Sequence, residues 1–71
     1  MAGLRKRSIN LSGHATSLAL EPEFWAVLER EADRARLSLS AFVASVDASR
    51  GERPLASALR LRALLAARDV S

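Results

Sequence analysis

Polar and apolar residues alternate with a period of two over residues 15–20, which predicts a short β-strand with one buried and one outward face. The buried face would carry Thr16, Leu18 and Leu20, and the outward face Ala15, Ser17 and Ala19. Residues 8–12 alternate as well, but Gly13 and His14 break the register, so Gly13 marks a bend, a bulge or a turn. The pattern leaves open whether residues 8–12 form a separate strand.

The next segment, residues 22–36, has apolar side chains at helical spacing. Pro22 suits a first helical turn, because the N–H that it lacks would be unpaired there. The apolar stripe consists of Phe24, Trp25, Leu28, Ala32 and Ala35. Charged residues fall mainly on the opposite side, so we predict an amphipathic helix.

Two more helices are predicted after it. Residues 39–50 form the second, with Ser38 as the N-cap and Gly51 as the stop. Its apolar residues are Leu39, Phe42, Val43 and Val46. A third helix, residues 54–68, begins at a proline, and we expect it to pack on the same domain because the connection before it is short.

The length of 71 residues bounds the chain to one domain, and a domain this small usually needs a staple or a partner. Cysteine is absent, and we find no cluster of metal-ligating residues, so we expect neither a metal nor a cofactor. We therefore predict a mostly α protein with one short strand, and that strand needs a partner strand from a second copy of the chain. The predicted dimer core is Leu18, Leu20, Phe24, Trp25, Leu28, Phe42, Val43 and Val46.

The net charge of +3 is divided into blocks: +3 in residues 1–20, −3 in residues 21–47 and +3 in residues 48–71. The first block contains Arg5, Lys6 and Arg7 and no acid. We therefore predict that residues 1–7 form a basic, disordered arm. A basic end favours a polyanionic partner such as nucleic acid, although a solubilising tail has the same composition.

Several other classes of function lack support in the sequence. No apolar run has the length of a signal peptide core or a membrane span, so we expect a soluble, cytoplasmic protein with no membrane contact. No nucleophile with a base, acid–base pair or phosphate loop is recognisable, so we expect no enzyme. We interpret Trp25 as a core residue, and Ser38 and Ser40 as capping residues.

Three features occur in a specific order: Leu20 at the end of the strand, the pair Phe24-Trp25 in the first helix, and the Ser38-Leu39-Ser40 start of the second. Through these three features the chain resembles the ribbon-helix-helix family of DNA-binding proteins, the class of the MetJ and Arc repressors. The resemblance covers about residues 15–50. Residues 7–25, together with a third helix starting near residue 55, resemble a bacterial subgroup of that family.

The resemblance implies an intertwined homodimer with an intermolecular two-stranded antiparallel ribbon. It also implies that this ribbon enters the DNA major groove and that the second helix binds a phosphate at its N-terminus. The base-facing residues would then be Ala15, Ser17 and Ala19, whose short side chains predict weak sequence reading. The phosphate-binding residues would be Ser38, Leu39 and Ser40, with Arg36 where the family usually has glycine. Arg5, Lys6 and Arg7 would add electrostatic attraction, while Asn10 and His14 could contact bases or serve the bend at Gly13.

We therefore expect a homodimeric protein that binds double-stranded DNA and regulates transcription. The competing hypothesis is an interaction module of the same fold, for example antitoxin-like, with weak or no DNA reading and a C-terminal helix that docks a protein partner. A surface binder of anionic lipid is less favoured, because the arginines of that helix are not confined to one face.

Overall fold

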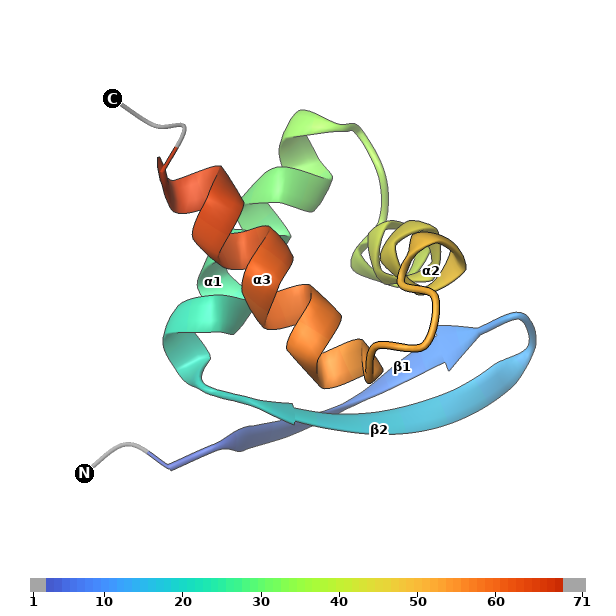
Figure 1. Ribbon diagram of the computed structural model, residues 1–71. Helices are drawn as coiled ribbons and strands as arrows, with labels where there is room; N and C mark the ends of the chain where they lie inside the picture. Colours follow the sequence, from blue (N-terminus) through green and yellow to red (C-terminus); the bar gives the residue numbers. More distant parts are fainter. Residues whose placement is uncertain (1–2, 69–71) are drawn as a thin grey trace.

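A two-stranded sheet and three helices make up the computed structural model, which describes residues 3–68. Along the chain the elements are β1 (Arg5–Leu11), β2 (His14–Leu20), α1 (Pro22–Arg34), α2 (Leu39–Ser49) and α3 (Leu55–Arg68). The three helices lie on one face of the sheet, and the other face is open (Figure 1). The expected fold class, an antiparallel ribbon followed by helices with one extra at the C-terminal end, is confirmed.

The two strands form a hairpin within a single chain. They pair antiparallel from Arg5 opposite Leu20 to Leu11 opposite His14. Ser12 and Gly13 connect them with φ angles of 51° and 82°. Positive φ at both central residues is what a type I′ hairpin turn requires, so Gly13 belongs to a tight turn rather than to a bulge.

This hairpin differs from the expected arrangement in two respects. Residues 5–7, expected in a disordered arm, begin β1, and residues 8–11 continue it as a separate strand. As a result, β2 pairs with its own chain, whereas we had expected its partner strand to come from a second copy.

Contacts between β1 and α1 explain why these basic residues are ordered. The Trp25 indole Nε1 donates a hydrogen bond to the Arg5 carbonyl oxygen at 2.9 Å. The Arg7 guanidinium lies 5.0 Å from the centre of the Trp25 ring and pairs with the Glu29 carboxylate at 2.9 Å. The buried indole thus gains a polar partner and a cation on its face, and both come from β1.

The hydrophobic core is closed within one chain. Of the eight residues expected in a dimer core, seven are buried here and Phe24 is half-buried. Ile9 from β1, and Leu59 and Ala63 from α3, are buried in the same cluster. β1 and α3 therefore cover the apolar surface that we expected a second copy to cover.

Helix α3 packs against α1, α2 and β2. One ion pair fastens it to the start of α1, because Arg60 Nε donates to the Glu21 carboxylate at 3.0 Å. The pKa of the Glu21 carboxyl lies below its ordinary value of 4.5. The larger cause is a hydrogen bond from the Glu21 backbone amide, and the next is the hydrogen bond from Arg60. The ionised form of Glu21 is therefore favoured in the folded state.

We predict that Glu21→Gln lowers stability at neutral pH and that the loss disappears in acid. A depressed carboxyl pKa stabilises the fold above the unfolded value, and this contribution is lost as the pH falls below 4.5 toward the folded value. Urea unfolding of both proteins over a pH series measures the difference. Glu23→Gln is the control, because Glu23 makes no ion pair among residues 3–68. A difference that does not change with pH would contradict this account.

Candidate nucleic-acid interface

The open face of the hairpin carries side chains from both strands. Cross-strand partners share a face, and the partners here are Lys6 with Ala19, Ser8 with Ser17, and Asn10 with Ala15. We call these six residues the outer face. All are exposed except Ala19, which is half-buried. The three β2 residues expected to face outward therefore lie on the open side of the sheet.

Strand β1 adds to this face the longer polar side chains that β2 lacks. Lys6 and Asn10 are hydrogen-bond donors able to reach a phosphate oxygen or a base edge, and the outer face contains no carboxylate. Sequence reasoning assigned Lys6 to a disordered basic arm and gave Ser8 no role, because it did not include residues 5–7 in a strand. The signal was present in the alternation of residues 6–11, which places Ile9 and Leu11 on the opposite face.

The other expected contact residues are divided between the two faces. Arg7 lies on the helix-covered face, where it pairs with Glu29, so the three basic residues do not share one face. Arg5 is exposed and pairs with the last residue of β2. Asn10 belongs to the outer face, whereas His14 pairs with Leu11 and belongs to the opposite set.

The N-terminus of α2 has the geometry of an anion site. The Ser38 hydroxyl accepts a hydrogen bond from the Ala41 amide at 3.0 Å, which confirms Ser38 as the N-cap. The amides of Leu39 and Ser40 make no hydrogen bond within the described part of the chain. Two N–H groups at the positive end of a helix dipole attract an anion such as a phosphate.

The turn before α2 has an unusual residue in a glycine position. Arg36 has a φ of 59°, which is the left-handed region. Its amide donates to the Asp33 carbonyl, and the Leu37 amide donates to the Ala32 carbonyl at 2.9 Å, which together form a Schellman motif. This is why α1 ends at Arg34, two residues before the expected end. The backbone thus makes the turn without glycine, and the exposed residue Arg36 comes two residues before the N-cap Ser38.

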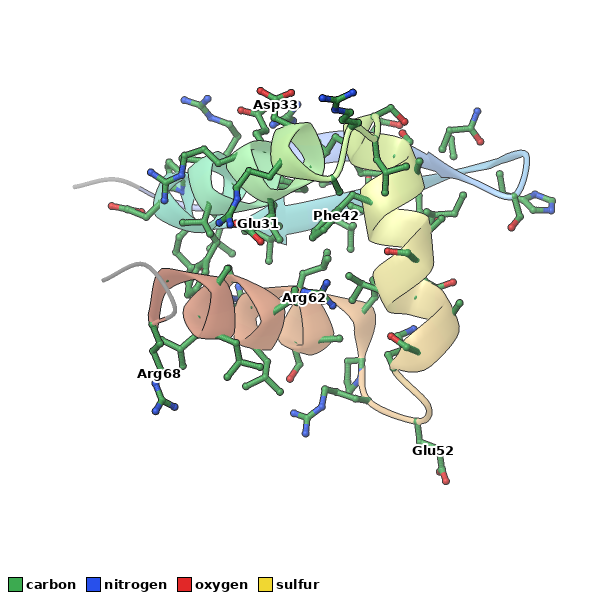
Figure 2. All side chains as sticks on the ribbon, turned by 90° about the horizontal axis from the view of Figure 1, so that it is seen from above. Glu31, Asp33, Phe42, Glu52, Arg62 and Arg68 are labelled. Carbon is green, nitrogen blue, oxygen red and sulfur yellow. The ribbon has the colours of Figure 1, made fainter. Side chains whose placement is uncertain are left out.

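Acidic residues oppose the anion site at α2. A shallow hollow beside Ser38 and Leu39 is also lined by Glu29 and Asp33. Arg7 balances the charge of Glu29, but Asp33 makes no ion pair within residues 3–68 and points outward from α1 (Figure 2). The α2 N-terminus is therefore a mixed site, in which Arg36 attracts and Asp33 repels a phosphate.

The described structure offers little support for a metal site, a buried acid–base pair or a membrane-spanning helix. Residues 3–68 contain no group of three His, Cys, Asp or Glu side chains able to hold a metal ion. No polar or charged side chain in this range is buried, so the part of the chain that we describe has no shielded acid–base pair. None of its helices is long and apolar enough to cross a membrane.

Comparison with known families gives one result. A family model described as a ribbon-helix-helix domain matches residues 4–67, which span both strands and nearly all of α3. The resemblance seen in the sequence is thereby confirmed. No curated protein and no solved structure shows a significant match to the chain.

We predict that Arg36→Gly stabilises the fold by about 1 kcal/mol, because glycine removes the cost of a side chain in the left-handed region. Urea unfolding measures the change. Arg36→Ala is the matched control, since it removes the same charge but keeps the Cβ atom. Equal stability of the two variants would show that the backbone at residue 36 is not strained.

Proposed function

The chain belongs to the ribbon-helix-helix family, and we propose that it is a homodimeric DNA-binding protein that regulates transcription. In this proposal the sheet inserts its outer face into the major groove of double-stranded DNA, and the α2 N-terminus binds a backbone phosphate. The observation that supports it best is the outer face itself, which is exposed, free of acids and uncovered by any of the three helices (Figure 1).

The two edges of the sheet differ in their suitability for pairing with a second copy. The structure gives neither edge a third strand within the described residues. β1 begins with Arg5, Lys6 and Arg7, and charged side chains on an edge strand oppose pairing with another strand. β2 has no Lys, Arg, Asp or Glu. We therefore propose that two copies pair through the open edges of their β2 strands.

This pairing assigns different tasks to the two strands. The two β2 strands form a central ribbon, and a two-stranded ribbon fits the major groove. Its short side chains, Ala15, Ser17 and Ala19, allow close approach to the bases but discriminate among them weakly. The β1 strands lie on either side, where Lys6 and Asn10 reach the phosphates. Affinity then comes mainly from phosphate contacts and depends strongly on salt.

The groove-binding proposal predicts that Lys6→Ala weakens binding to duplex DNA and flattens its salt dependence. The slope of log affinity against log salt should fall by about one for each phosphate contact removed. Fluorescence anisotropy with a labelled duplex of mixed sequence, over a range of salt, measures both quantities.

Arg30→Ala is the matched control for Lys6→Ala. Arg30 is exposed on α1, makes no ion pair among the described residues, and lies outside the outer face. The Arg30→Ala variant loses the same charge but at a position outside the interface, so it should leave the salt slope nearly unchanged. Absence of DNA binding at low salt, or an equal loss in both variants, would refute the proposed interface.

The edge-pairing proposal predicts that Ser17→Lys dissociates the dimer. Ser17 is the central residue of β2, so an antiparallel β2–β2 pair centred there brings the two lysines together, and like charges directly opposite destabilise strand pairing. Ser8→Lys is the control, because Ser8 lies on the same face but on β1. Sedimentation equilibrium measures the mass. A monomeric wild-type protein, or equal dissociation in both variants, would exclude pairing through β2.

A further inference from the structure

A groove runs between α2 and α3, away from the outer face. It is open to solvent and has a volume of about 180 Å³. Val46 of α2 and Ala58, Leu61 and Leu65 of α3 form its apolar floor. Val46 and Ala58 are buried, but Leu61 and Leu65 are 41% and 45% exposed.

The exposed leucines form a second apolar face on α3. The opposite side of the helix carries Leu59, which is fully buried in the core. Leu61, Leu64 and Leu65 fall on the outward side at spacings of three and four residues, and Leu64 is 55% exposed. Contact with the rest of the chain therefore accounts for only one face of this helix.

The rim of the groove is basic and has no acid of its own. Of its three arginines, Arg50 is paired with Asp47. Arg53 and Arg62 pair with no carboxylate in residues 3–68, and no carboxylate lines the groove. Glu52, in the loop before α3, points away from the body of the protein (Figure 2).

Arg62 is also held in place. Its guanidinium carbon lies 5.4 Å from the centre of the Phe42 ring, and Figure 2 shows it on the side of α3 that faces the other helices. A guanidinium stacked on a ring loses less freedom when it binds a carboxylate, and the planar group can receive both carboxylate oxygens. Arg62 is thus oriented in advance for an acidic ligand.

We propose that this groove docks an amphipathic helix of another protein, with leucine-like side chains on the face that enters and Asp or Glu beside them. The floor presents Leu61 and Leu65 one helical turn apart, which matches the anchor spacing of a helix laid in a groove. Arg53 and Arg62 then pair with the flanking carboxylates. This proposal concerns a different surface from the outer face and does not depend on DNA binding.

The chemistry of the groove disfavours other occupants. A second copy of α3 brings leucines but no carboxylate, since α3 has no acidic residue, so its arginines would meet arginines. Duplex DNA would pair with Arg53 and Arg62 but would leave the leucines in water or against phosphates. An anionic lipid surface offers both negative charge and hydrocarbon, so a measurement with phosphatidylserine vesicles is needed to distinguish it from a helix.

The test uses the full chain and a fluorescein-labelled helical peptide with leucines at positions i, i+4 and i+7 and glutamates beside them. A second peptide has lysine in place of each glutamate. Anisotropy should show that the wild-type protein prefers the glutamate peptide. Arg62→Glu should weaken that binding about tenfold and improve binding of the lysine peptide, because the charges are exchanged.

Two further variants keep the test decisive. Arg53→Glu reverses a charge on the groove without removing the contact with Phe42, and should act in the same direction as Arg62→Glu. Arg30→Glu reverses an equal charge on α1 outside the groove, and should leave the preference unchanged. Circular dichroism confirms that each variant is folded.

Four results would overturn the proposal. The first is no binding of the glutamate peptide to the wild-type protein. The second is equal weakening by Arg30→Glu and Arg62→Glu. The third is binding to phosphatidylserine vesicles that Arg62→Glu abolishes, together with no preference between the two peptides, which would make the occupant a lipid surface. The fourth is a loss of duplex DNA binding by Arg62→Glu equal to that of Lys6→Ala, which would assign Arg62 to the DNA interface instead.

Discussion

The pairing of β1 with β2 is the constraint on which the rest of this structure depends. A lone β2 would have needed a second copy to satisfy its backbone and cover its apolar face. In this chain β1 does both, because it pairs with β2 along its length and places Ile9 in the core. Trp25 and Arg7 then fasten β1 to α1. A family fold usually described as two interlocked chains thus closes its core within one.

Closure of the core changes what a dimer can contribute. Each large apolar side chain buried in the core stabilises the fold by roughly 1.5 to 3 kcal/mol, and here that burial is achieved within one chain. In the proposed dimer, a second copy would therefore add strand pairing at the β2 edge and a longer DNA footprint, rather than the core itself. Folding and dimerisation should accordingly be separable in this protein.

The sequence predicted the helices and β2 well, because Phe42, Val46 and the residues between Leu18 and Leu28 follow clear periodicities. For β1 the sequence left open whether residues 8–12 form a strand, and it wrongly placed residues 5–7 in a disordered arm, since three consecutive basic residues hide the alternation that Ile9 and Leu11 continue. Arg7 occupies an inward position, which a hydrophobicity pattern cannot anticipate; its partners, the Trp25 ring and the Glu29 carboxylate, lie on another element. The left-handed backbone at Arg36 also gave no local signal, because the residue expected there in a Schellman motif is glycine.

The position of each arginine says more about function than the net charge does. Arg7 and Arg60 are paired with Glu29 and Glu21, so they contribute little to the attraction of a distant polyanion. The groove arginines, Arg53 and Arg62, differ from Lys6 in their neighbours. Alanine and serine surround Lys6, as suits a surface that approaches a phosphate backbone, whereas exposed leucines lie beside Arg62. A cation next to apolar surface is best matched by a ligand that offers both a carboxylate and a hydrocarbon face, and a protein helix has both.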